Sequence, residues 1–169
     1  MEKQTLADIF LEDHEFIKKL LDEFKRFQAI KSQDLQLFKK IRWIFEKHVF
    51  FEEKSLFSWC EFKRSVDEKF VLRLLKEHDK LISLMKQMEN EIENLVLVNI
   101  NEVIGEIDMH IDFEEEFFYE KLDSSLTQKQ KSQIKEGLAQ SAKTGFYPIQ
   151  KIREYGWANL KKYCSTKWN

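Results

Sequence analysis

The chain has little of what sheet proteins, disulfide-stapled proteins and secreted proteins usually need. It has only 4 glycines and 1 proline among 169 residues, so turns are scarce and long helices are favoured. The two cysteines, Cys60 and Cys164, are isolated and predict neither a disulfide framework nor a CxxC redox motif. No signal peptide opens the chain and no apolar run approaches bilayer length, so we expect a cytoplasmic protein outside the membrane.

An excess of positive charge is also missing. Basic residues number 28 and acidic residues 30, the formal net charge is −2, and no basic stripe stands out. This balance gives no electrostatic case for binding nucleic acid or an anionic membrane. Phenylalanine, in contrast, is abundant at 15 residues, which predicts a bulky, dry core. The length suits one domain that buries this core without disulfides.

Four long segments have apolar residues at helical spacing, and polar or small residues separate them: about 5–32, 33–65, 65–98 and 99–122. The first and third segments open with the spacing of a capping box, in Thr5–Asp8 and Ser65–Glu68. Asn99 with Glu102 opens the fourth in the same way. Long helices joined by short connections predict an all-α, up-down-up-down four-helix bundle over residues 1–125.

The remaining residues, 126–169, predict a helical extension packed on the bundle. Thr127–Ala142 has the pattern of a shorter helix. A last amphipathic segment follows, with Pro148 suited to its first turn. A dimer contact is the alternative role for this extension.

The four histidines fall one in each long segment, beside its apolar stripe: His14, His48, His78 and His110. Two of them are followed one turn later by a glutamate, in the pairs His48–Glu52 and His110–Glu114. The midpoints between successive histidines are Lys31, Lys63 and Asn94, close to the predicted turns. Residues equidistant from a turn share one height in an antiparallel hairpin, so we expect all four histidines in one layer.

A lone histidine or a single HxxxE pair is more often an ordinary surface or core feature. The joint arrangement differs, and it predicts metal ligands: His14, His48, Glu52, His78, His110 and Glu114. Six such ligands exceed a four-coordinate structural zinc site, and calcium or magnesium would prefer oxygen alone. The mixed set favours two transition ions bridged by carboxylates, with iron first. Such cations would compensate the buried charges of Glu52 and Glu114.

The motifs "HVFFE", "KEHDKL" and "HIDFE", after a histidine in the first helix, resemble the hemerythrin-like HHE cation-binding family over about residues 5–122. The resemblance implies a four-helix bundle around a non-haem di-iron centre. His14 and His48 would then bind one iron, and His78 and His110 the other. Glu52 and Glu114 would bridge the two irons, and the resemblance also allows an oxo or hydroxo bridge.

The histidine count resembles one branch of this family more than another. Five-histidine oxygen carriers have an HxxxH pair on the third helix, whereas Leu74 and Ile82 stand one turn from His78 here. Four histidines and two glutamates are more similar to the iron-centre repair proteins of bacteria. Glu115 occupies the longer spacing from His110 found in the oxygen carriers, and it is either a surface charge or a nearby carboxylate.

Aromatic residues surround the predicted ligands in the sequence. We expect four phenylalanines near the histidine layer: Phe10, Phe51, Phe113 and Phe117. They would line a narrow, dry pocket for a small molecule, or they are simply core. Tyr119 stands five residues after Glu114 and is predicted to face elsewhere.

These residues together predict a redox protein of the stress response. Its centre would react with O₂, NO or peroxide, or supply iron to damaged iron centres through an acceptor or redox partner. One alternative is reversible O₂ binding for storage. Another is a metal- or O₂-sensing module whose C-terminal extension contacts a partner. The sequence leaves open whether the protein is an enzyme and whether it is a monomer or a homodimer.

Overall fold

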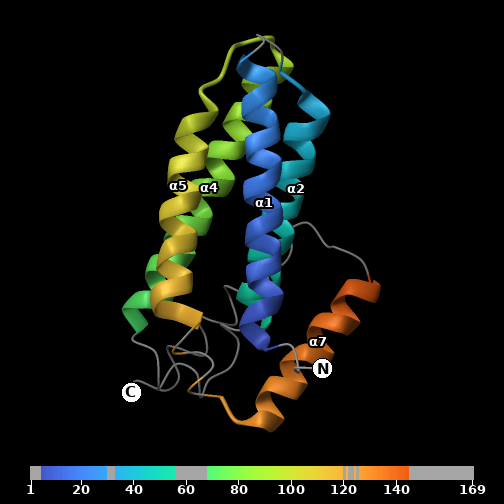
Figure 1. Cartoon of the computed structure of the whole chain (residues 1–169), viewed down its shortest axis with the longest axis vertical. Helices are drawn as coiled ribbons and strands as arrows, with labels where there is room; N and C mark the ends of the chain where they lie inside the picture. Colours follow the sequence, from blue (N-terminus) through green and yellow to red (C-terminus); the bar gives the residue numbers. More distant parts are fainter. Residues whose placement is uncertain are drawn as a thin grey trace, which may run out of the picture.

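Four long helices run side by side in the computed structural model, which describes residues 5–29, 33–55, 68–119, 121, 124 and 126–144. These helices are α1 (Leu6–Ala29), α2 (Leu35–Ser55), α4 (Glu68–Glu93) and α5 (Ile100–Phe113), and the π-helix η1 (Glu114–Phe118) continues α5. Both α1 and α4 pack on α2 and on α5, which closes the bundle. Successive helices alternate in direction (Figure 1). The predicted all-α, up-down-up-down bundle is therefore confirmed.

The helix starts use the caps that the sequence predicts where the structure describes them. The Thr5 amide donates to Asp8 Oδ2 at 2.5 Å, and the Asp8 amide donates to Thr5 Oγ1 at 3.1 Å. These reciprocal bonds satisfy amides that a helix start leaves without partners. Asn99 caps α5 by accepting from the Asn101 amide. The cap predicted at Ser65 lies outside the described residues.

Two apolar clusters fill the bundle, one on each side of the histidine layer. We call the first the loop-side core, since it extends toward the α4–α5 loop. Its most deeply buried members include Phe24, Phe38, Ile41, Met85, Ile100 and Val103. The second, the α7-side core, consists of Phe10, Val71, Leu74, Leu75, Phe113, Phe118, Tyr119, Leu126 and Ile134. Each histidine thus lies between apolar residues at both ends of the bundle, which keeps the layer dry.

A further helix, α7 (Gln128–Thr144), lies obliquely at the end of the bundle where α1 begins (Figure 1). It corresponds to the shorter helix predicted over Thr127–Ala142. It contacts α2, and its Ile134 belongs to the α7-side core. The final amphipathic segment with Pro148 lies outside the described residues, and a domain boundary at residue 125 stays a prediction.

Side-chain hydrogen bonds join the two connections at the opposite end. Gln28 Nε2 donates to the Val98 carbonyl at 2.8 Å, and Gln33 Nε2 donates to the Val96 carbonyl at 2.9 Å. These bonds connect the α1–α2 junction to the α4–α5 loop and help to set the height of one hairpin against the other. None of the described helices combines the length and apolar character that a membrane span requires.

Candidate metal centre

Four imidazole rings meet in the layer between the two cores. His14 extends from α1, His48 from α2, His78 from α4 and His110 from α5, and all four are buried. His14 Nε2 lies 3.2 Å from His48 Nε2. The ring centroids of His78 and His110 are 4.8 Å apart. The convergence predicted from the turn midpoints is therefore present, because the antiparallel hairpins keep an even rise on both sides of each turn.

Glu114 lies among all four rings and is fully buried. Its Oε2 atom is 3.1 Å from His14 Nε2 and 3.9 Å from His48 Nε2. Its Oε1 atom is 3.2 Å from His110 Nε2 and 3.6 Å from His78 Nε2. The carboxylate thus presents one oxygen to each pair of histidines.

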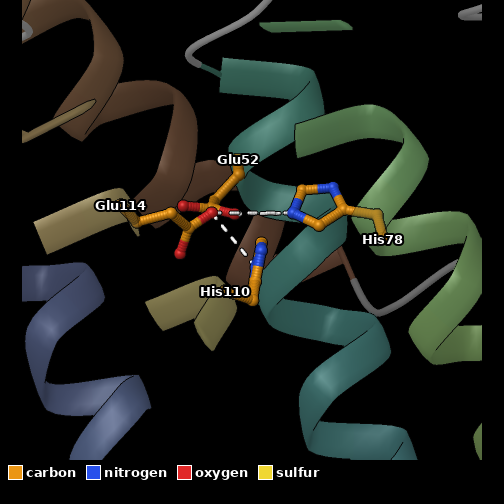
Figure 2. A group of neighbouring side chains, drawn as sticks. All are labelled: Glu52, His78, His110 and Glu114. Carbon is orange, nitrogen blue, oxygen red and sulfur yellow. Dashed lines mark ion pairs between the residues drawn. The ribbon is translucent and has the colours of Figure 1, made fainter. Parts of the chain in front are cut away.

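Glu52 is also fully buried, and it approaches the centre from α2. Its Oε2 atom is 3.5 Å from His48 Nε2 and 3.4 Å from His78 Nε2. Figure 2 shows Glu52 and Glu114 side by side, with His78 and His110 directed at them. The HxxxE spacing predicts that each glutamate points to the same side of its helix as the histidine four residues before it.

The donor atoms form two sets that could each hold a metal ion. One set contains His14, His48 and Glu114, and the other contains Glu52, His78, His110 and Glu114. Glu114 belongs to both sets. The two sets separate the histidines into the same pairs that the family resemblance implies. The role of these six residues as ligands stays a prediction.

Within the part of the chain that the structure describes, some buried polar atoms that face the centre have no hydrogen-bond partner, among them Glu52 Oε2, Glu114 Oε1 and His110 Nε2. His110 Nε2 is close to Glu114 Oε1, yet the two atoms are not oriented for a hydrogen bond. Burying such atoms without a partner is costly, whereas a transition ion binds converging nitrogen and carboxylate donors well. The residues of this layer therefore fit one or more metal cations.

A carboxylate from a neighbouring helix faces the outer nitrogen of every histidine. The Nδ1 atoms of His14, His78 and His110 hydrogen-bond to carboxylate oxygens at 3.0, 3.0 and 3.1 Å. His48 Nδ1 has a looser ion pair at 3.7 Å. The four pairs are Glu115–His14, Glu53–His78, Glu77–His110 and Asp13–His48.

These pairs form a closed ring around the bundle. An acid on α1 faces the histidine of α2, and an acid on α2 faces that of α4. The series continues from α4 to α5, and from η1 back to α1. A carboxylate that accepts from Nδ1–H fixes the tautomer and leaves Nε2 as the atom that can bind a metal.

Sequence reasoning missed three of these acids, Asp13, Glu53 and Glu77, and left Glu115 undecided. Each acid stands directly beside a predicted ligand in the chain, and that adjacency was the available signal. Glu115 is partly exposed and also hydrogen-bonds to His14, so it is both a surface charge and a carboxylate near the centre.

The chain itself supplies part of the charge compensation. Burial opposes a charge on His48, but Glu52, Asp13 and Glu114 together outweigh it and raise the pKa of His48 to about 10. Burial opposes a charge on His78 too, but Glu114, Glu52 and Glu53 together raise its pKa well above the ordinary value. Burial opposes a charge on Glu114 too, yet His110 and the other imidazoles hold its pKa well below its usual range. Protons on His48 and His78 therefore stabilise the buried carboxylates, and a bound cation would replace those protons.

The phenylalanines divide between the layer and the surface. Phe10 packs edge-on against His48, with ring centroids 6.0 Å apart, and Phe113 is buried in the α7-side core. Phe51 is only partly buried and packs against both cores. Phe117 is 45% exposed, so its predicted place around the ligands is wrong. The sequence prediction did not single out Phe45, which packs against both His48 and His110.

The π-helix η1 explains why Phe117 and Tyr119 depart from expectation. In η1 the Tyr119 amide bonds to the Glu114 carbonyl, five residues back. The wider turn brings Tyr119 onto the face of Glu114 and leaves Phe117 outside. Tyr119 is only 3% exposed, and its hydroxyl donates to Glu52 Oε1 at 2.6 Å. The prediction that Tyr119 faces elsewhere assumed α-helical geometry and is wrong.

The family model of the Hemerythrin HHE cation binding domain matches residues 5–122 of the chain. This range includes the four bundle helices, η1 and the six residues of the two donor sets. Searches for similar curated proteins and for similar solved structures gave no match. The matched range ends before α7 begins.

Proposed function

The chain belongs to the hemerythrin HHE cation-binding domain family, and from that premise we propose that it is a non-haem di-iron protein for small oxidants. The oxidants are O₂, NO or peroxide, encountered in oxidative or nitrosative stress or during the repair of iron centres. One observation carries the proposal: two buried donor sets, of three and four residues, share Glu114. A carboxylate shared by both sets can bind two adjacent cations and offset part of their repulsion.

The six residues have distinct roles in this proposal. His14 and His48 hold one iron ion, His78 and His110 hold the other, and Glu114 binds both. Glu52 joins the set of His78 and His110. When bound, iron supplies redox chemistry and positions at which a small molecule can coordinate. The chain holds the imidazoles in place through their Nδ1 partners, because the rings cannot turn without losing those bonds.

The surroundings of the layer favour a small, uncharged or compact reactant. Phe10 and Phe45 pack against the imidazoles, and an apolar core lies on each side of the layer. Such packing excludes bulk water and leaves little room for a large substrate. Diatomic molecules and peroxide meet this limit on size.

The test is to load the metal-free protein with ferrous iron under nitrogen, and to measure iron content and the visible spectrum. We expect about two iron ions per chain and a spectral change with at least one of O₂, NO and peroxide. Transfer of reduced iron to an acceptor protein would favour repair. An oxygenated species that reverts under nitrogen would favour reversible O₂ binding instead. An unchanged spectrum and iron content with all three oxidants would exclude oxidant chemistry.

Variants separate the site from iron bound adventitiously. His110→Ala should lose the iron of one donor set, and Glu114→Ala should lose iron from both. Glu116→Ala is the matched control, because Glu116 is an exposed carboxylate of the same η1 segment. Full iron retention in the first two variants, with circular dichroism as a check on folding, would refute the ligand assignment.

A further inference from the structure

The two oxygens of Glu52 have different surroundings. Oε2 lies 3.5 Å from His48 Nε2 and 3.4 Å from His78 Nε2, and none of the described residues hydrogen-bonds to it. Oε1 accepts from the Tyr119 hydroxyl at 2.6 Å. Glu114 differs, because each of its oxygens faces one pair of histidines. The two central carboxylates are therefore unequal.

Tyr119 is held in place on several sides. Its ring stacks on Phe10, with centroids 5.8 Å apart and an interplanar angle of 20°. The ring also lies 5.7 Å from that of His14 and 5.7 Å from that of Phe118. The hydroxyl is 3.4 Å from His14 Nε2 and 3.5 Å from Glu114 Oε2, both longer than the bond to Glu52. A ring packed in this way presents its hydroxyl to Glu52 at little entropic cost.

The Tyr119 hydroxyl is the donor of this hydrogen bond, and Glu52 Oε1 is its acceptor. A neutral phenol is a donor, and a short bond to a carboxylate is strong.

We propose that Tyr119 is a positioning residue, which holds Glu52 Oε1 and thereby keeps Oε2 directed at His48 and His78. This inference rests on the proposed iron site and adds an asymmetry to it. Glu114 spans the two donor sets with both oxygens, whereas Tyr119 reserves one oxygen of Glu52. The hydrogen bond also withdraws electron density from Glu52, which makes the carboxylate a weaker donor to ferric iron.

The test is to compare the reduction potential of the iron-loaded protein with that of Tyr119→Phe. Loss of the hydrogen bond should make Glu52 a stronger donor and shift the potential to a more negative value, with iron retained. Difluorotyrosine in place of Tyr119 is a stronger hydrogen-bond donor and should shift the potential the other way. If Tyr119→Phe does not fold, the fluorinated protein alone decides the matter.

Phe117→Leu serves as the control, since Phe117 is an aromatic residue of the same η1 segment and is partly exposed. An unchanged potential in the Tyr119 variants, or an equal shift in the control, would overturn the proposal. A phenolate-to-iron charge-transfer band that disappears in Tyr119→Phe would also overturn it, because Tyr119 would then be a ligand. Iron content of the unaltered protein reports separately on the iron site itself.

Discussion

At the residue scale, each histidine of the centre acts through both ring nitrogens. The inner nitrogen faces Glu52 or Glu114, and the outer nitrogen faces an acid of the adjacent helix. A carboxylate in that outer position makes the imidazole a stronger donor and fixes its orientation. Residues that do not face the centre should therefore affect metal binding almost as much as the ligands do.

Glu53 offers the best test of this effect, because it is buried and bonds to His78 Nδ1 at 3.0 Å. Glu53→Gln removes the charge but keeps an oxygen that can accept, and Glu53→Ala removes both. We expect ferrous-iron affinity to fall by about 10–100-fold in Glu53→Ala and by less in Glu53→Gln. Competition with a chelator under nitrogen measures the affinity.

The control for Glu53 is Glu116→Gln, which neutralises an exposed carboxylate of η1, the segment that also contains Glu114. Its affinity should match that of the unaltered protein. Equal affinity in Glu53→Ala and in this control would mean that the outer carboxylates do not influence the metal.

The convergence of the six proposed ligands could be predicted from sequence, whereas the contacts of most of the outer acids could not. His48 and Glu52 are four residues apart, so one helix suffices to align them. Glu53 is next to Glu52 but points in a different direction on that helix. From one helix alone, Glu53 would therefore be predicted to face solvent. Its partner His78 belongs to another helix, so only the packed bundle reveals the contact.

At the element scale, η1 is the feature that helical periodicity could not predict. The segment Glu114–Phe118 contains no glycine or proline to mark it, and its residues are compatible with an ordinary α-helix. A π-turn differs by one residue in its hydrogen-bond register, and tertiary packing decides between the two. Here Tyr119 becomes buried and Phe117 becomes exposed. The starts and caps of α1 and α5 depend on local chemistry and were predictable, whereas the end of α5 at Phe113 was not.

The loop after α4 contains a conformational strain that can be removed. Leu95 has a φ of 61°, which is the left-handed conformation. At this end of α4 the Leu95 amide donates to the Ile92 carbonyl, and the Val96 amide donates to the Glu91 carbonyl. These two bonds form the Schellman pattern. Leu95 is 91% exposed, so its side chain stabilises little. Leu95→Gly should raise the free energy of unfolding by roughly 0.5–1 kcal/mol, measured by urea denaturation.

The matched control is Leu97→Gly, another exposed leucine of the same loop, for which no positive φ is recorded. That change only adds freedom to the unfolded chain, so stability should stay equal or fall slightly. A destabilised Leu95→Gly would mean that the left-handed conformation costs this leucine nothing.

At the scale of the whole molecule, a charged layer crosses an otherwise apolar bundle. The layer lies between the loop-side core and the α7-side core, and Phe51 packs against both cores. Stability therefore depends on how well the layer's charges compensate one another. In the metal-free protein, protons on His48 and His78 contribute to that compensation.

The stability of the metal-free protein should fall at alkaline pH. The pKa of His48 is raised from 6.5 to about 10 in the folded state, so the folded protein binds this proton more tightly than the unfolded chain. The contribution is complete below pH 6.5 and is lost as the pH rises through about 10. Urea unfolding with a chelator present, at several pH values in this range, measures the loss.

His48→Gln is the comparison for the alkaline effect, because glutamine does not titrate. Its free energy of unfolding should change less steeply over the same pH range. Equal slopes for the two proteins would mean that His48 does not hold its proton above the ordinary pKa.

The pKa of Glu114 is shifted the other way, to a value well below 4.5 in the folded state. Its contribution to stability is therefore present above pH 4.5 and is lost as the pH falls through the lower folded pKa.

Metal binding and proton binding should therefore exclude each other across the whole layer. His48 and His78 hold protons on nitrogens that a metal would need, so ferrous iron must displace them. Calorimetry at neutral pH in two buffers of different ionisation enthalpy should give different heats, because the buffer takes up the released protons. Iron should also stabilise the fold, by about 2.7 kcal/mol per site at a free concentration 100 times Kd. Equal heats in both buffers, with iron bound, would mean that these imidazoles are neutral before binding, and that the alkaline loss of stability has another origin.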